Sequence, residues 1–366
     1  MKISVVGAGI AGLSTAWALA KQGHSVILFE QGTIPNPMGA SGDHHRIIRR
    51  AYGAGSGYGV AITEAYEAWD EVWADLGQSC LDPRGFMAVS REPGDEAEDY
   101  LNGLREGGWP CDVLQPGEAA KRFPFLDPDT IRYAFVSPEG GALHCRRIGF
   151  GLAAWLQVNG VSLRQTMRVR EVDPARAAVT TEDGRVIEAD MVIVTAGAWV
   201  TKLFPDLVSD LAAYRTAVVY LDPPSHLAEA WAHAPVVLDV GGETDGYILP
   251  PSGGGGLKFG SGLHKMKNAD ADANREPVAG EGETVRNLFA PPMRDIEQYR
   301  VTDVVTCAYT FTEDERFFVD RRDNCLVVSA CSGHGYKFGA AVGRRVAQYV
   351  EHGDFGALKA WMRAEG

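Results

Sequence analysis

The chain has 366 residues, of which 45% are hydrophobic and 23% are charged, and its formal net charge is −13. These proportions are those of a globular protein long enough to build two packed cores. The excess of acid repels phosphate backbones and anionic lipid surfaces, so we expect neither nucleic acid nor a membrane as a partner.

The cysteines and the start of the chain suggest a reducing compartment. The six cysteines include no C-x-x-C pair, so neither a zinc site nor a dithiol redox pair is predicted. The chain opens with strand-like residues rather than with a secretory signal, and no apolar run is long enough to span a bilayer. We therefore expect a cytoplasmic protein without a metal.

The first thirty residues predict a strand, a helix and a second strand around a G-x-G-x-x-G motif. Residues 2–6 include three β-branched apolar side chains, and GAGIAG follows at 7–12. Helical spacing continues to Gly23, and the second strand at 26–29 is closed by Glu30. The glycines let a pyrophosphate approach the helix N-terminus, and the acid suits the ribose hydroxyls. The pattern predicts a bound ADP moiety but does not decide between NAD and FAD.

A second informative segment is GASGDHHRIIRRAYG at 39–53. If its basic run RIIRR starts a helix, Arg46 and Arg49 share one face and Arg50 joins them at i+4. A solvated basic turn is the alternative, and we favour it for Arg50.

Residues 161–200 predict a strand, a β-meander with turns at 173–174 and 183–184, and an apolar strand that runs into TAGAW at 195–199. Flavoproteins often carry such a strand, with a small-residue turn that meets the cofactor. An ordinary buried strand is the alternative interpretation.

Residues 211–313 contain several short strand patterns separated by turns. A polar stretch at 264–283 is predicted to be a surface loop. Lys258 interrupts the apolar strand GLKFG, so it is either an edge-strand charge or a buried functional cation. Cys307, in the strand TCAYT, is by itself most simply a packed core residue.

The C-terminal part predicts a strand, a glycine-rich loop with the sequence SGHGYKF, and a helix that begins near Phe338. Such a helix start can direct amides and a positive dipole end at the pyrimidine ring of a flavin, which gains negative charge on reduction. This segment favours FAD over NAD.

Together these segments resemble the monomeric sarcosine oxidase and N-methyltryptophan oxidase group of the D-amino acid oxidase-like flavoproteins. The matching motifs occur in the family's order along nearly the whole chain: GAGIAG with Glu30, RIIRRAYG, TAGAW, GLKFG, TCAYT and SGHGYKFGAAVG. The first motif is shared by many enzymes, whereas GLKFG, TCAYT and SGHGYKF together are much more specific.

The resemblance implies an α/β fold. A discontinuous Rossmann-type FAD-binding domain would carry an inserted α+β substrate domain built on a largely antiparallel sheet. We expect the FAD-binding domain at 1–79, 141–210 and 314–366, and the substrate domain at 80–140 and 211–313. A monomer is also implied.

The resemblance implies that FAD is the cofactor and that it is bound covalently. In that family a cysteine in this place is bonded through sulfur to the flavin 8α-methyl group, and Cys307 matches it. The residues implied to contact the cofactor are Gly7, Gly9, Ile10, Ala11, Gly12, Glu30, Ser41, His45, Arg46, Val169, Ala196, Gly197, Trp199, Cys307, Gly333, His334, Gly335 and Lys337. For His334, packing within the loop is the alternative.

The residues that the resemblance assigns to catalysis and substrate binding are Arg46, Arg49, Tyr247, Lys258, Tyr309 and Lys337. Arg49 binds the substrate carboxylate, Lys337 is the second carboxylate anchor, and Arg46 lies against the flavin. Lys258 faces the flavin and promotes reaction with oxygen. The two tyrosines are walls of the substrate pocket, with cross-strand packing as the alternative.

Two departures from the family's pattern lie near the substrate. His45 stands where the family has a threonine, and Gly262 stands where it has a histidine. Both changes leave the substrate open, so sarcosine itself is not predicted.

We therefore expect an FAD-dependent oxidase of an amino acid or of an N-alkyl or cyclic secondary amino acid. It would release an imine and reduce dioxygen to hydrogen peroxide. The alternatives are a dehydrogenase of the same fold that passes electrons to a carrier, a non-catalytic flavin-binding subunit, and an NAD-dependent enzyme.

Overall fold

The computed structural model describes residues 1–329 and 331–365. The strands are β1 (Lys2–Val6), β2 (Ser25–Phe29), β3 (His45–Arg49), β4 (Leu81–Asp82), β5 (Phe86–Ser90), β6 (Asp112–Leu114), β7 (Tyr133–Ser137), β8 (Gly140–His144), β9 (Ser162–Arg164), β10 (Val169–Asp173), β11 (Ala178–Thr181), β12 (Val186–Glu188), β13 (Met191–Val194), β14 (Ala212–Asp222), β15 (Val236–Leu238), β16 (Gly246–Leu249), β17 (Leu257–Lys267), β18 (Arg300–Phe311), β19 (Phe318–Arg322) and β20 (Cys325–Ser329). The α-helices are α1 (Ile10–Lys21), α2 (Gly57–Leu76), α3 (Glu96–Glu106), α4 (Pro116–Arg122), α5 (Cys145–Val158), α6 (Val200–Leu203), α7 (Ala228–His233), α8 (Glu281–Asn287), α9 (Gly339–His352) and α10 (Phe355–Met362).

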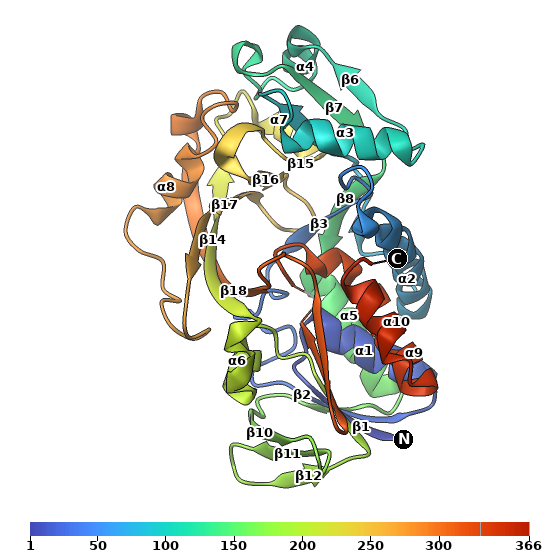
Figure 1. Cartoon of the computed structure of the whole chain (residues 1–366). Helices are drawn as coiled ribbons and strands as arrows, with labels where there is room; N and C mark the ends of the chain where they lie inside the picture. The colour runs from blue at the N-terminus through green and yellow to red at the C-terminus, as the bar shows by residue number, and fades with distance from the viewer. Residues whose placement is uncertain (330, 366) are drawn as a thin grey trace.

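A six-stranded sheet has the order β19-β20-β13-β1-β2-β9, and every pair in it is parallel except β19 with β20. Successive side chains of its central strands point to opposite faces of the sheet and pack into different hydrophobic cores. Ile193 packs with α1, α5 and α9 on one face, whereas Val194 packs on the other face with the meander β10–β12 and with α6 (Figure 1). Burial on both faces explains why these strands read as continuous apolar runs.

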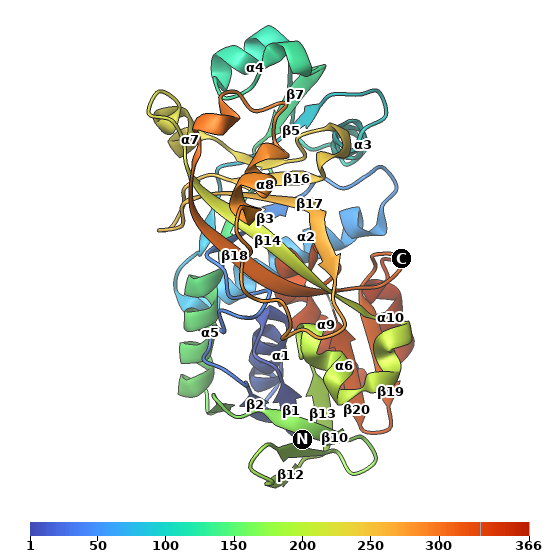
Figure 2. The ribbon, with the colours of Figure 1, turned by 90° about the vertical axis from the view of Figure 1, so that its left-hand side faces the viewer.

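An eight-stranded sheet has the order β18-β14-β17-β16-β15-β5-β7-β6, and its pairs are antiparallel except β15 with β5. Its longest strands, β14, β17 and β18, run side by side across the molecule (Figure 2). One face is closed by aromatic packing, with Phe259 lying against Trp231 and Phe289. The predicted fold class, a Rossmann-type unit with a second unit on a largely antiparallel sheet, is confirmed.

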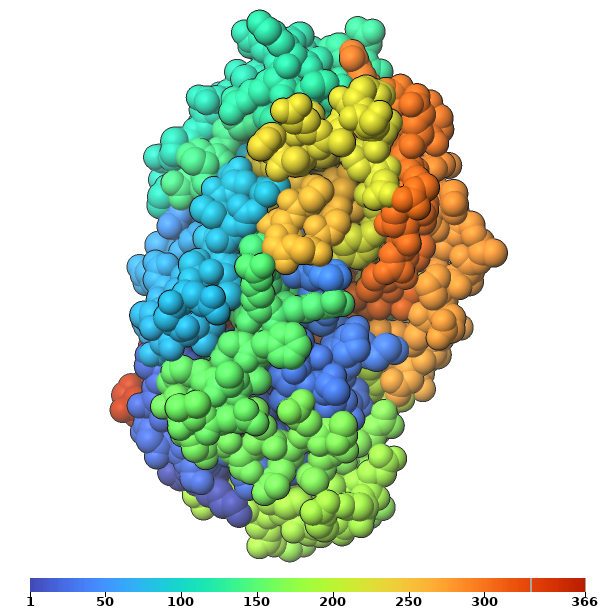
Figure 3. Space-filling view, turned by 180° about the vertical axis from the view of Figure 1, so that it is seen from behind, coloured from blue at the N-terminus to red at the C-terminus, as the bar shows by residue number. Residues whose placement is uncertain are grey.

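A small sheet, β3-β8-β4, brings the basic segment beside residues 140–144. Residues 46–49 do not begin a helix, because the adjacent residues Ile47 and Ile48 lie in an antiparallel ladder with β8. From behind, the blue segment around residue 40 lies directly below the yellow-orange segment around residue 255 (Figure 3), consistent with the contact between His44 and Gly255.

Other boundaries follow the sequence closely. Helix α1 ends at Lys21, and Gly23 follows it with a φ of 82°. Residues 335–338 form a 3-10 turn before α9 begins at Gly339. The stretch 264–283 is not wholly a loop: β17 extends to Lys267 and α8 begins at Glu281. The strand extends because its polar end still pairs with β14.

Candidate active site

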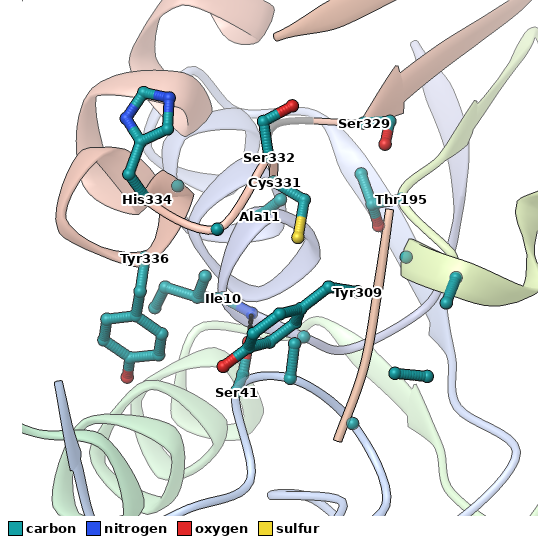
Figure 4. Close-up of a pocket in the computed structure, with 18 of the residues that line it drawn as sticks. Ile10, Ala11, Ser41, Thr195, Tyr309, Ser329, Cys331, Ser332, His334 and Tyr336 are labelled. Carbon is teal, nitrogen blue, oxygen red and sulfur yellow. Dashed lines mark hydrogen bonds between the residues drawn. The ribbon is translucent and has the colours of Figure 1, made fainter. Parts of the chain in front are cut away.

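A cavity of about 970 Å³ lies where the strand-to-helix turns of the six-stranded sheet meet the long strands β14, β17 and β18. The residues predicted from the sequence that line it are Gly7, Gly9, Ile10, Ala11, Glu30, Ser41, Arg46, Arg49, Val169, Ala196, Gly197, Trp199, Tyr247, Tyr309, Gly333, His334, Gly335 and Lys337. Figure 4 shows part of this lining, with the sulfur of Cys331 directed toward the ring of Tyr309. Segments far apart in the chain therefore form one site.

The turn between β1 and α1 is built for close approach of a ligand. A Cβ added to Gly12 would lie 1.8 Å from the carbonyl oxygen of Gly7, so only glycine allows this packing. Gly12 itself does not line the cavity, in keeping with this packing role. The amide of Ile10, at the helix N-terminus, donates to Oγ of Ser41 at 3.0 Å. The turn fits a pyrophosphate, because the first-turn amides and the helix dipole favour an anion.

Glu30 closes this end of the cavity. Its two carboxylate oxygens accept bonds from the amides of Ala8 and Gly32, each at 2.9 Å, and one also accepts from Asn36 at 2.8 Å. A carboxylate offers about four acceptor positions, so capacity remains for a hydroxyl donor. The position fits the expected ribose contact.

The loop before α9 presents Gly333 with a φ of 76°, followed by His334. The imidazole is held in protein contacts: it stacks on Phe317 and its Nδ1 lies 3.2 Å from the hydroxyl of Tyr52. Burial, followed by the charge of Lys337, lowers the pKa of His334 to about 3. A neutral imidazole suits a role in shaping the loop rather than in proton transfer.

Arg49 and Lys337 are two buried cations in the cavity wall. The guanidinium of Arg49 lies between the rings of Tyr52 and Tyr100, at 4.6 and 4.4 Å from their centroids. Its Nε and Nη1 have no hydrogen-bond partner among the described residues, although the residue is only 5% exposed. Nζ of Lys337 bonds to the hydroxyl of Tyr52 at 3.0 Å and to the carbonyl of His334 at 3.1 Å.

No acid pairs with either cation in the part of the chain that the structure describes. Burial, followed by the charge of Arg49, lowers the pKa of Lys337 well below its ordinary 10.5. Leaving two charges buried without a counterion is costly, so an anionic ligand is the natural complement to this pair.

A second charged cluster lies beside the first and, unlike it, contains an acid that pairs with both of its cations. Asp43 accepts from Nζ of Lys258 at 2.9 Å and from Nη1 of Arg46 at 2.7 Å. The hydroxyl of Tyr220 also donates to Asp43, and Nη2 of Arg46 lies 3.2 Å from the hydroxyl of Tyr309. Burial alone would raise the pKa of Asp43, but Lys258 and Arg46 hold it well below 3.8. Asp43 is therefore ionised.

Four residues assigned from the sequence do not line the cavity: Gly12, His45, Lys258 and Cys307. Lys258 is 0% exposed and lies behind Arg46, where Nζ also donates to the carbonyl of His45 at 2.6 Å. The imidazole of His45 packs parallel to Tyr220, and burial lowers its pKa to about 2. The side chain of His45 does not line the cavity, because the strand directs the ring into the protein.

The thiol of Cys307 is 2% exposed, and its Sγ lies 3.8 Å from Nη2 of Arg46. Burial raises the pKa of this thiol, whereas Arg46 acts in the opposite direction. Two other cysteines, Cys145 and Cys331, do line the cavity.

Several residues of the site escaped the sequence analysis. Asp43 and Tyr52 lie within the segment 39–53, and an acid three residues before Arg46 was a usable signal for an ion pair. Tyr100 and Asp245 also line the cavity, but they come from distant segments without a motif. Only the folded chain brings them there.

The parallel sheet, the glycine turn with its acid, and the cation-lined cavity define a dinucleotide-binding oxidoreductase. Residues 2–349 match the model of the family described as FAD dependent oxidoreductase, and the chain belongs to this family.

The chain is 27% identical over 356 residues to the monomeric sarcosine oxidase of Bacillus sp. (strain B-0618), covering 94% of this chain and 91% of that protein. It is 24% identical over 354 residues to the N-methyl-L-tryptophan oxidase of Yersinia pestis (strain Pestoides F), covering 95% and 94%. The solved structure of L-proline dehydrogenase from P. horikoshii is similar with a TM-score of 0.83 at 19% identity, covering 100% and 96%, and shows the same fold. The predicted family and the expectation of an FAD-dependent amine oxidase are confirmed.

Within residues 1–329 and 331–365, no helix is long and apolar enough to cross a bilayer. The same residues hold no group of three or more His, Cys, Asp or Glu side chains placed to bind a metal ion.

Proposed function

We propose that the protein oxidises the amine of an amino acid or secondary amino acid whose carboxylate lies between Arg49 and Lys337. The observation that carries this proposal is the pair of buried cations with no acid partner among the described residues. A carboxylate would satisfy the planar guanidinium through two bonds and the ammonium through a third. The substrate loses two electrons and two protons to become an imine, and dioxygen takes them up as hydrogen peroxide.

The groups that would hold FAD are the first-turn amides of α1, Glu30, and the loop from Gly333 to Gly335. The glycine turn leaves room for a pyrophosphate that a side chain would fill. FAD, when bound, supplies the acceptor for the electrons that leave the carbon–nitrogen bond. The protein's own part is to anchor the carboxylate, so that the amine-bearing carbon is held in one orientation, and to exclude water with Tyr247 and Tyr309.

We also propose that Cys307 bonds covalently to the flavin: its sulfur would replace one hydrogen of the 8α-methyl group, and the two electrons and two protons released would pass to dioxygen. Its neighbours Ala308 and Tyr309 line the cavity, and the guanidinium of Arg46 favours the thiolate that such a bond requires. Cys331 is the competing thiol because its sulfur lies in the cavity wall. A cytoplasmic location and a monomeric state remain predictions from the sequence.

A screen of anaerobic flavin bleaching tests the proposal. The purified protein, with its flavin, is mixed with amino acids and with N-methyl or cyclic amino acids, and absorbance near 450 nm is followed. We expect bleaching by at least one carboxylate-bearing amine and none by the matching amine without a carboxylate. Equal bleaching by amines with and without a carboxylate, or no bleaching by any amine, would contradict the proposed function.

A dehydrogenase remains a second candidate because of one observation. Lys258, assigned to oxygen reactivity, is paired with Asp43 and does not line the cavity. An ammonium neutralised in this way gives less stabilisation to a reduced oxygen species. Peroxide yield under air separates the candidates: an oxidase forms one peroxide per substrate consumed, whereas a dehydrogenase needs an added electron carrier.

A further inference from the structure

Asp245 contributes a carboxylate to the cavity that the proposed reaction does not use. The residue directly follows the 3-10 turn Gly242–Thr244 and has a φ of 43°. Its side chain lines the cavity, and no hydrogen bond of the described residues involves its carboxylate. The side chain is therefore available to a ligand in the cavity.

The backbone of Asp245 is held by β17. The amide of Gly262 donates to the carbonyl of Asp245 at 2.9 Å. A Cβ added at Gly262 would lie only 1.5 Å from Oδ2 of Asp245, so the acid occupies the space that a side chain at 262 would need. The glycine at 262 thus leaves the space in the cavity wall that the side chain of Asp245 occupies.

The surroundings of Asp245 are acidic. Asp245 is exposed to the cavity, yet desolvation by the surrounding protein, followed by the charge of Glu96, raises its pKa to about 6, and Lys265 acts in the opposite direction. Lys265 is shared, because its ammonium lies 3.5 Å from Glu315. All four side chains line the same cavity. This part of the cavity lining, the acidic wall, consists of Asp245, Glu96, Glu315 and Lys265. A bound cation would relieve the repulsion among its three acids.

The acidic wall is connected to the anion-binding end of the cavity. The ring of Tyr100 packs on Arg49 at 4.4 Å, and its hydroxyl donates to Glu96 at 2.7 Å. Arg49 is a buried cation whose Nε and Nη1 have no partner among the described residues. One tyrosine therefore separates a site for an anion from a carboxylate of the acidic wall, which suits a ligand with both charges.

We propose that Asp245, together with Glu96, binds a second, cationic group of the substrate, so that the preferred substrates are amino acids with a basic side chain. This inference rests on the function proposed above. The carboxylate of the substrate lies at Arg49 and Lys337, the amine to be oxidised lies between, and the distal cation pairs with Asp245.

The test compares Nα-methyllysine with N-methylnorleucine, which has a similar chain but lacks the distal ammonium. Anaerobic stopped-flow measures the flavin reduction rate over the dissociation constant for each compound. We expect the wild type to favour the lysine derivative by about tenfold or more, a factor that corresponds to one charged contact. The preference should be present above pH 6, where Asp245 is ionised, and should fall as the pH drops through that value.

Asp245→Asn should reduce this preference toward one and remove its pH dependence. Asparagine is chosen because it tolerates the positive φ at this position. Glu96→Gln, in the first turn of α3, is a second variant that should reduce the preference less. Asp70→Asn, an exposed acid on α2 outside the cavity, is the charge-matched control and should keep the full preference.

Equal use of both compounds by the wild type would overturn this inference while leaving the proposed function intact. An equal loss on both compounds in Asp245→Asn would also overturn it, since the acid would then act on the reacting amine or on the fold. If neither these compounds nor any other amine reduces the flavin, the proposed function fails and this inference fails with it.

Discussion

The carboxylate of Asp43 lies 2.9 Å from the ammonium of Lys258, and both side chains are almost completely buried. The same carboxylate oxygen lies 2.7 Å from Nη1 of Arg46, so two cations share one acid beside the cavity and the cluster keeps a net positive charge. The charge of Lys258 is therefore maintained by a protein group rather than by a cofactor alone. Burial still lowers the pKa of Lys258, and Asp43 acts against this effect.

Replacing Asp43 with Asn should destabilise the protein by about 3–5 kcal/mol, because it leaves two buried cations without their counterion. The pKa of Asp43 is held well below 3.8 in the folded protein. Its contribution is thus fully present above the ordinary pKa of an aspartate and is lost as the pH falls through the folded value. Urea unfolding at pH 7 and in acid measures the difference in the free energy of unfolding between the wild type and Asp43→Asn, with Asp70→Asn as control. A difference that grows in acid would contradict the ion pair.

Replacing Lys258 with Met should slow reoxidation of the reduced enzyme by dioxygen far more than it slows reduction by substrate. Lys258 and Arg46 carry two positive charges against the one negative charge of Asp43, so the cluster stays positive and stabilises the negative charge that oxygen acquires. Lys258→Met removes this net charge, and a loss of about 4 kcal/mol corresponds to roughly 10³-fold in rate. Stopped-flow measures the two half-reactions separately. Normal reoxidation with impaired reduction would assign Lys258 to substrate binding instead.

Replacing Arg49 with Met should weaken binding of carboxylate ligands by about 2–5 kcal/mol. Aromatic acids that perturb the flavin spectrum of the wild type provide the titration. Arg50→Met is the matched control, because Arg50 pairs with Glu139 at 2.9 Å and does not line the cavity. Equal affinity of the Arg49 variant and the control for these acids would exclude Arg49 as the anchor.

The affinity for such acids should fall as the pH rises through the pKa of Lys337. This pKa lies well below 10.5 because of burial and the charge of Arg49, and only the protonated amine attracts an anion. In Lys337→Met this pH-dependent fall in affinity should disappear. In Arg49→Met it should move to higher pH, because a neighbouring positive charge has been removed. A step that survives in Lys337→Met belongs to another group.

Acid precipitation and intact mass should show one FAD bonded to the wild-type chain, and a Cys307→Ala variant should lose the bond. The motive is the place of Cys307 beside Arg46, at 3.8 Å. Cys331→Ala is the informative control because Cys331 lines the cavity. Loss of the bond in Cys331→Ala but not in Cys307→Ala would transfer the attachment to that loop.

Local patterns were sufficient for the parts of the fold that depend on neighbours in sequence. The turn between β1 and α1 and the loop before α9 were predicted because glycine spacing and apolar runs determine them. The sequence of RIIRR did not decide between a helix and a strand, because two adjacent isoleucines suit both. Its strand depends on pairing with residues 140–144, about ninety positions away.

The polar groups that surround the predicted cations could not be read from the sequence in the same way. Asp43 meets Lys258 across 215 positions, and Tyr100 on helix α3 reaches Arg49 on strand β3. Cys307 and Lys258 were correctly expected in strands, but the alternation of those strands did not reveal which side chains line the cavity. Such contacts depend on how sheets pack, and no short motif encodes that packing.

The central strand β1 has consequences for how the protein is made. Its partner β13 ends at residue 194, and β20, which completes that side of the sheet, is formed only by residues 325–329. A ribosome therefore synthesises the nucleotide-binding turn first and the strands that stabilise it last. Pairings this distant form slowly: the edge of β1 that pairs with β13 stays open until residues 191–194 have been made, and β13 in turn waits for β20. Cofactor capture is accordingly an event that follows translation, and chains cut short before β20 should emerge colourless and be cleared by proteolysis.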